Sequence, residues 1–154
     1  MTRRRVVVTG MGMITPVGND VTSTWESLLT GCSGVGPITL FDSSPMRTHI
    51  AAEVKGFDPE AHFDKKDLRR IDRFSQFFLV AARQALADAG LAFQGDDEAA
   101  ARAGVVLGAG FGGMSSFISE IDVLRQRGPD RVSPYGVPKV IANMAAGLAS
   151  IEHH

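Results

Sequence analysis

The chain has 154 residues, of which 44% are hydrophobic and 21% charged, a composition typical of one globular domain or part of one. Its formal net charge of −1 excludes a general attraction to nucleic acid or to an anionic membrane. A single cysteine excludes an internal disulfide, and no apolar run approaches the ~20 residues that cross a bilayer, so we expect a cytoplasmic protein that acts on neither nucleic acid nor membrane.

The first predicted elements are a strand and a helix. The segment from Arg4 to Thr9 contains three consecutive valines, which is typical of a strand covered on both faces in a parallel sheet. Residues 21–30 repeat apolar side chains at helical spacing, with Asp20 as the expected N-cap and Gly31 as the expected stop. Residues 33–46 resemble a loop.

The middle of the chain predicts one long helix between two strands. Residues 48–54 favour a short edge strand. A helix is then expected from Asp64 to Gly90, because apolar residues recur at steps of three and four. The run from Ala103 to Leu107 predicts a second buried strand. Phe117, Ile121 and Leu124 indicate another helix, which Gly128 and Pro129 end, and an apolar, small-residue segment follows over 138–151.

Alternation of strands and helices predicts an α/β fold. Only two strands look central, and a parallel sheet of two strands would leave bare edges that normally need pairing or cover. We therefore expect this chain to be part of a larger domain and not to fold stably alone.

A glycine pattern lies between the second strand and the following helix. Gly108, Gly110 and Gly113 spell G-x-G-x-x-G, the pattern of dinucleotide-binding folds. Such a site also needs an acidic residue at the end of the next strand, whereas Asp130 lies in a loop rich in proline and glycine. A nucleotide site is therefore not expected. Two readings stay open: the glycines allow a close approach of backbones, or they line a narrow substrate channel.

Five stretches in order resemble the β-ketoacyl-acyl-carrier-protein synthases, and most closely the elongating synthase II type. They are VVVTGMGMITPVGN, the Trp25–Gly34 pattern W-x-x-L-L-x-G-x-S-G, RRIDRFSQFFLVAARQALADAGL, GAGFGGM and SPYGVPKVIANMAAG. The resemblance runs from about Arg4 to Ile151. It implies a thiolase-like fold, of which this chain would be the first part of the N-terminal αβαβα half, and a homodimer.

The resemblance also implies a decarboxylative Claisen condensation of malonyl-carrier protein with an acyl thioester in fatty-acid elongation. The family's nucleophilic cysteine and two histidines are expected downstream of His154, so residues 1–154 alone should be inactive. No cofactor of the enzyme's own is implied, because phosphopantetheine arrives on the carrier-protein substrate. Cys32 follows the end of a predicted helix, where the helix dipole disfavours a thiolate, so we expect it to have no catalytic role. Adjacent His153 and His154 lack a third ligand nearby, and no metal site is expected.

A basic group on the long predicted helix is a candidate docking surface. Lys66, Arg69, Arg70 and Arg73 are spaced to share one side of a helix, away from its apolar face. Such a group can be an ordinary solvated face. The resemblance implies that Lys66, Arg69 and Arg70, together with Arg131, dock the acidic acyl carrier protein. Asp130 inverts the charge of one position that is basic in the family.

The resemblance places an acyl pocket at Phe111, Gly110, Tyr135 and Gly136. Phe111 stands where many family members have a smaller aliphatic residue, and Gly136 where they often have phenylalanine. We hypothesise a volume exchange, in which Phe111 occupies space near that left by Gly136 of the second subunit. The alternative is that Phe111 is simply a core residue.

Two other functions stay open. A chain of this family without the active cysteine could be a non-catalytic partner, like the chain-length-factor subunits of polyketide systems. A nucleotide-binding α/β domain is the third reading, and tight binding of NAD or FAD would support it.

Overall fold

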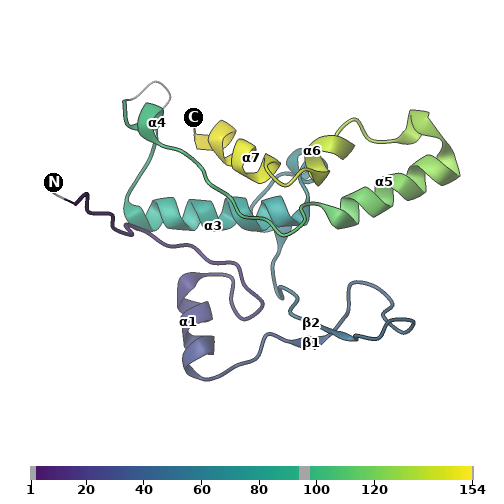
Figure 1. Ribbon diagram of the computed structural model, residues 1–154, viewed down its shortest axis with the longest axis horizontal. Coiled ribbons are helices and arrows are strands. Elements are labelled where there is room, and N and C mark those ends of the chain that lie inside the picture. The colour runs from purple at the N-terminus through teal and green to yellow at the C-terminus, as the bar shows by residue number, and fades with distance from the viewer. Residues whose placement is uncertain (1–2, 94–97, 154) are drawn as a thin grey trace. The chain divides into compact units, whose positions relative to one another are not determined.

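The computed structural model describes residues 3–93 and 98–153 and separates the chain into two compact units. The first unit comprises Met1–Asp58 and Ala81–Leu91, and the second comprises Pro59–Val80 and Ala92–His154. Helix α3 contributes residues to both. Each unit is described by itself, with the elements labelled in Figure 1.

The described elements are mostly helices. The α-helices are α1 (Val21–Leu29), α2 (Lys65–Leu68), α3 (Arg73–Ala89), α4 (Glu98–Arg102), α5 (Met114–Arg127), α6 (Gly136–Val140) and α7 (Met144–His153). Two short 3-10 helices are η1 (Pro59–Ala61) and η2 (Pro129–Arg131), and two short strands are β1 (Gly36–Pro37) and β2 (Ile50–Ala51).

In the first unit, α1 begins and ends where the sequence predicts. The Asp20 carboxylate accepts a hydrogen bond from the backbone N–H of Ser23 at 2.7 Å, as an N-cap does. Gly31 adopts a φ of 70°, and the N–H of Cys32 reaches back to the carbonyl of Ser27 at 2.9 Å. This Schellman geometry satisfies the last carbonyls of the helix and needs glycine at its left-handed position.

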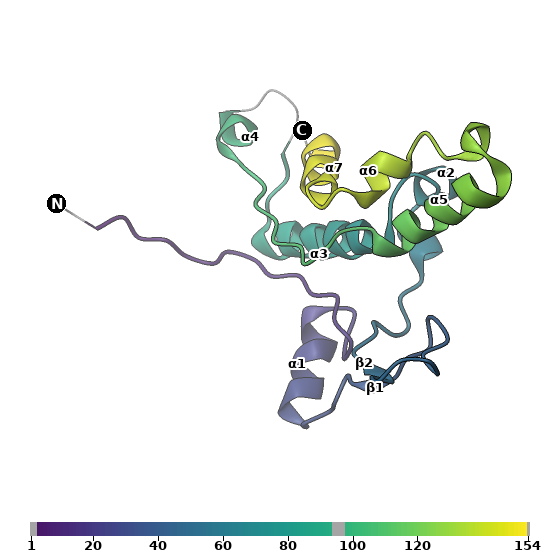
Figure 2. The ribbon, with the colours of Figure 1, turned by 45° about the vertical axis from the view of Figure 1, so that its right-hand side comes forward.

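The two strands of the first unit form a minimal antiparallel pair, with Gly36 opposite Ala51 and Pro37 opposite Ile50 (Figure 2). The sequence predicts a short edge strand within residues 48–54, and β2 confirms it over two residues. Glu53, just beyond β2, accepts hydrogen bonds from the Thr39 hydroxyl at 2.6 Å and the Thr39 N–H at 3.0 Å. The Glu53 carboxylate thereby connects the chain after β2 to the chain after β1, beyond the last backbone pair of the two strands.

The N-terminal segment of the first unit lies against the second half of α3 (Figure 1). The N–H of Met13 donates to the Gln84 side chain and that of Met11 to Asp88, each at 2.9 Å. A Cβ on Gly12 would lie 1.9 Å from the carbonyl oxygen of Ala81, so only glycine allows this approach.

The prediction of two central strands, at residues 4–9 and 103–107, is wrong for the described part of the chain. Residues 4–9 and 103–107 have no strand pairing among the described residues. Val6 and Val8 of the first unit are 90% and 81% exposed, and Val106 of the second is 96% exposed. A strand exists only through hydrogen bonds to a neighbour, and neither valine run has one within residues 3–93 and 98–153.

The helix predicted from Asp64 to Gly90 is in fact two helices. Arg69 ends α2, and the N–H of Arg70 returns to the carbonyl of Asp67 at 2.8 Å. Asp72 then acts as a new helix start, since its carboxylate accepts the N–H of Phe74 at 3.2 Å. Gly90 terminates α3 as expected, with a φ of 64°.

In the second unit, the expected helix around Phe117 is confirmed as α5, and the small-residue segment after it forms α6 and α7. At the end of α6, the carbonyl of Val140 accepts the N–H of Gly113, a residue distant in the chain, at 3.1 Å. Ala145 and Ala149 of α7 are 0% and 2% exposed, which confirms that small side chains permit close packing there. Phe63, Ile71, Leu79 and Val80 are further buried apolar residues of this unit.

Within the described ranges, no helix has the length and apolar character needed to cross a bilayer.

Candidate functional site

The basic residues of the candidate docking surface lie on three different local structures. Lys66 is on α2, which Asp64 caps by accepting the N–H groups of Lys66 and Asp67, both at 2.8 Å. Arg69 and Arg70 follow in the connection, and Arg73 begins α3. The prediction that all four cations share one helical face is therefore corrected, because Asp72 interrupts the helix.

Three of these cations are nevertheless displayed together on one short segment. Lys66, Arg69 and Arg70 are all exposed, whereas Ile71 and Asp72 directly after them are buried. The buried pair fixes the backbone, while the cations face solvent. A dense group of exposed positive charge on a fixed backbone suits an acidic partner.

Arg70 has a ring contact that connects this segment to a distant part of the chain. Its guanidinium carbon lies 5.1 Å from the ring centroid of Tyr135, the residue before α6. The distance is within the ≈ 6 Å range of cation–π attraction. Sequence reasoning missed this contact, because no periodic pattern relates residues so far apart in the chain.

Arg131 lies in η2, between α5 and Tyr135, and is exposed like Asp130 beside it. Gly128 with a φ of 83° ends α5 and turns the chain into η2. The contact between Arg70 and Tyr135 brings the segment that carries Arg131 to the segment that carries Arg69. The two halves of the predicted docking surface are therefore on connected segments of one unit.

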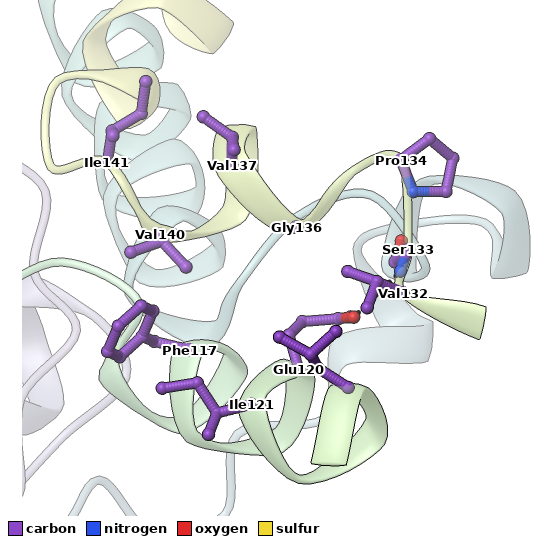
Figure 3. A pocket seen from close by; sticks show the side chains of 11 residues that line it. Phe117, Glu120, Ile121, Val132, Ser133, Pro134, Gly136, Val137, Val140 and Ile141 are labelled. Atoms are coloured by element: carbon purple, nitrogen blue, oxygen red, sulfur yellow. Dashed lines mark hydrogen bonds between the residues drawn. The ribbon is translucent and has the colours of Figure 1, made fainter. Parts of the chain in front are cut away.

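A largely apolar pocket of about 350 Å³ lies between α5 and the segment 132–141 (Figure 3). Helix α5 supplies one wall and the α6 segment the other. The lining residues are Phe117, Glu120, Ile121, Leu124, Val132, Ser133, Pro134, Gly136, Val137, Val140 and Ile141. Its size and lining suit a small apolar group.

Glu120 is the one acidic residue in the lining of this pocket. Its carboxylate accepts the backbone N–H of Ser133 at 2.8 Å, and Figure 3 shows the two side by side. This bond connects α5 to the chain leading into α6 and holds the two walls of the pocket together.

The four residues assigned to the acyl pocket have different environments. Gly136 is buried and lines this pocket, and a Cβ there would lie 3.6 Å from Glu120 Cγ. Phe111 is 71% exposed, and nothing lies within 4 Å of a Cβ at Gly110. Tyr135 does not line this pocket and faces Arg70 instead. The acyl-pocket assignment of these four residues stays a prediction.

The glycine pattern serves different purposes at its different positions. Nothing lies within 4 Å of a Cβ at Gly108 or Gly110, whereas one at Gly113 would lie 2.2 Å from the carbonyl oxygen of Lys139. Gly112, with a φ of 89°, approaches the carbonyl of Val140 in the same way. Close approach of backbones therefore explains Gly113 of the pattern and Gly112 beside it.

Cys32 belongs to the first unit, where it is exposed and lies 3.4 Å from the Thr30 hydroxyl. Nε2 of His153 lies 3.6 Å from a Glu152 carboxylate oxygen, while His154 lies outside the described residues. Among the residues that the structure describes, no group of three His, Cys, Asp or Glu side chains could hold a metal ion.

Solved structures define the class of protein. The chain is similar to the ishigamide ketosynthase/chain length factor, at 28% identity with a TM-score of 0.81 over 98% of this chain and 37% of that one. It is also similar to a type II PKS ketosynthase bound to its acyl-carrier protein, at 29% identity with a TM-score of 0.76 over 98% and 39%. These are ketosynthases of the thiolase fold, which confirms the expected α/β fold class.

The family follows from the sequence match. Residues 3–154 match the family model of the beta-ketoacyl synthase N-terminal domain, and the chain belongs to that family. It is 48% identical over 149 residues to a 3-oxoacyl-[acyl-carrier-protein] synthase 2 of Staphylococcus aureus, and 46% identical over 153 residues to one of Coxiella burnetii. The two matches include 97% and 99% of this chain, respectively. The chain spans 36% of the length of each relative.

Proposed function

We propose that the whole protein containing these residues is a 3-oxoacyl-[acyl-carrier-protein] synthase of the type II class, an acyltransferase of fatty-acid elongation. The observation that carries the proposal is the family match over residues 3–154. The relatives named above, at 46–48% identity, carry this name. The reaction would join malonyl-carrier protein to an acyl thioester with loss of carbon dioxide.

In this proposal, residues 1–154 are the N-terminal portion of the N-terminal ketosynthase domain. The nucleophilic cysteine and the two histidines lie downstream of His154. A thiolate forms the acyl-enzyme, and donors stabilise the charge that develops on the thioester oxygen. Residues 1–154 contribute to docking of the carrier protein and to binding of the acyl chain. No cofactor belongs to the enzyme itself, since phosphopantetheine comes with the carrier protein.

We further propose that Lys66, Arg69, Arg70 and Arg131 bind the acidic carrier protein. Their exposure supports this role, and so does the contact between Arg70 and Tyr135, which connects the segment of Lys66, Arg69 and Arg70 to the segment that follows Arg131. One of the similar solved structures is a ketosynthase in complex with its acyl-carrier protein. The protein acts as a cytoplasmic homodimer.

Acyl binding is assigned to Phe111, Gly110, Tyr135 and Gly136. Support comes from Gly136, whose absent side chain leaves room in an apolar pocket of about 350 Å³. In the dimer, Phe111 of one subunit would use the space left by Gly136 of the other. Its 71% exposure in the single chain is consistent with a ring that packs against a second subunit.

The test is condensation by the full-length protein, with malonyl- and acyl-carrier proteins as substrates. Replacing Lys66, Arg69 or Arg70 by alanine is expected to raise KM for carrier-linked substrate about two- to five-fold each with kcat little changed, because each exposed charge pair is worth up to ~1 kcal/mol. The increase should shrink at high salt.

Arg125→Ala is the matched control, because it removes one exposed charge from α5 outside the proposed docking set. Equal effects of Arg125→Ala and Arg70→Ala would contradict the docking proposal. Absence of any condensation by the intact, folded protein would contradict the proposed activity.

A non-catalytic partner subunit is the second candidate, favoured by the similarity to a ketosynthase/chain length factor structure at a TM-score of 0.81. In the family, the nucleophilic cysteine follows a threonine-alanine pair, and the residue at that position discriminates the two functions. Cysteine at that position indicates the catalyst, and glutamine or another residue indicates the partner.

A further inference from the structure

The contact between Arg70 and Tyr135 suggests a role for a residue that the family resemblance places in the acyl pocket. Tyr135 is 39% exposed and Arg70 is exposed, so both reach the surface of the second unit. The guanidinium lies 5.1 Å from the ring centroid. A cation at this distance is attracted by the negative face of the ring.

The backbones on both sides of this contact are held in place. On one side, the N–H of Arg70 donates to the carbonyl of Asp67 at 2.8 Å, and Ile71 and Asp72 are buried. On the other side, the N–H of Tyr135 donates to the Ser133 hydroxyl at 3.2 Å, and its carbonyl accepts from the N–H of Lys139 at 3.0 Å. The ring and the guanidinium therefore extend from backbones that are both held by hydrogen bonds.

A guanidinium over a ring keeps its N–H groups available. The five donors of arginine lie in the guanidinium plane, so their edges can still form bidentate bonds to a carboxylate or a phosphate. An exposed arginine normally loses rotamer freedom when it binds, and this loss weakens binding. A ring that restrains the side chain beforehand reduces that loss.

We propose that Tyr135 is a positioning residue that restrains Arg70 for binding the acidic carrier protein. This inference rests on the proposed function. It gives Tyr135 a place on the docking surface, while the next residue, Gly136, lines the apolar pocket. The docking surface and the pocket then share one short segment of chain, before and within α6.

The test compares three replacements of Tyr135 in the full-length protein, with a malonyl-loaded acyl carrier protein as substrate. Tyr135→Ala and Tyr135→Leu remove the ring and are expected to raise KM about two- to five-fold with kcat little changed. Tyr135→Phe keeps the ring and should restore the original KM. With malonyl-pantetheine, which has no protein to dock, removal of the ring should raise KM by less than it does with the carrier-linked substrate.

A double-mutant cycle assigns the effect to the pair. Tyr135→Ala should add little to Arg70→Ala, because the arginine that the ring restrains is already gone. It should act independently of Arg69→Ala, for which the ring has no such role. Independent effects with both arginines would overturn the proposal.

The outcomes separate this inference from the function on which it rests. If the arginine variants raise KM and Tyr135→Ala does not, the positioning role is wrong and docking stands. If neither changes KM, docking at this surface is wrong. If Tyr135→Ala and Tyr135→Leu impair the carrier-linked and pantetheine substrates equally, the residue serves the acyl pocket or the fold, which also overturns the positioning role.

Discussion

At the scale of single residues, Gly113 is a position where one added methyl group should destabilise the fold. A Cβ there would lie 2.2 Å from the Lys139 carbonyl oxygen and 3.0 Å from an Asp72 carboxylate oxygen, and the N–H already binds the carbonyl of Val140. Because a backbone atom cannot move aside cheaply, we expect Gly113→Ala to lower the free energy of unfolding by about 1–3 kcal/mol. Urea denaturation of the full-length protein measures this.

Gly110→Ala is the control within the same motif, since nothing lies within 4 Å of its Cβ position. Its effect should be small or slightly stabilising, about 0.4–1 kcal/mol, through the unfolded state. Equal destabilisation by Gly110→Ala and Gly113→Ala would contradict the close-approach explanation. The motif letters alone could not separate these glycines, because the crowding at Gly113 comes from residues in α6.

At the scale of elements, helix ends were predictable where their chemistry is local. Asp20, Gly31 and Gly90 each act within a few residues of the helix that they cap, and all three predictions are confirmed. The break at Asp72 was not predictable, because apolar spacing continues through Ile71 and Phe74. The carboxylate of Asp72 is also held by the Ser116 hydroxyl at 2.5 Å, a partner far away in the chain.

The pairing of β1 and β2 should depend on pH through Glu53. Hydrogen bonds from the Thr39 hydroxyl, and then from backbone N–H groups, lower the pKa of this carboxyl below its ordinary value. A lowered pKa means that the charged form stabilises the folded segment above the ordinary pKa, and that this contribution is lost as pH falls through the lowered value. Hydrogen-exchange protection of the Thr39 and Leu40 amides should therefore decrease in acid.

Glu53→Gln should reduce protection of the same two amides already at pH 7, because a neutral amide is a weaker acceptor than a carboxylate. Glu26→Gln, on the exposed side of α1, removes the same charge and should leave these amides unchanged. Protection that stays constant in acid, and in the Glu53→Gln protein, would show that the carboxylate does not hold this segment.

At the scale of the whole molecule, the two valine runs separate what sequence can and cannot predict. Their β-branched residues correctly indicate chain that favours burial in a sheet, as the family's α/β fold class requires. They cannot supply the neighbouring strands, so residues 4–9 and 103–106 are exposed, and neither valine run has a ladder among the described residues. The docking and pocket residues were likewise predicted from motifs. The contact between Arg70 and Tyr135 could not be predicted in this way, because it joins residues that are distant in the sequence.

Because both valine runs are exposed, we expect that residues 1–154, expressed alone, do not unfold cooperatively. Val8 and Val106 are 81% and 96% exposed, and apolar strands without partners tend to associate with other chains. We expect a broad transition with aggregation in a thermal scan, and a sharp one from the full-length protein.

Val8→Thr and Val106→Thr keep the β-branched shape, so they should not destabilise the short chain further. In the full-length protein each should cost about 1–3 kcal/mol, if further strands bury the new hydroxyl. A sharp, reversible transition from monomeric residues 1–154 would contradict this prediction.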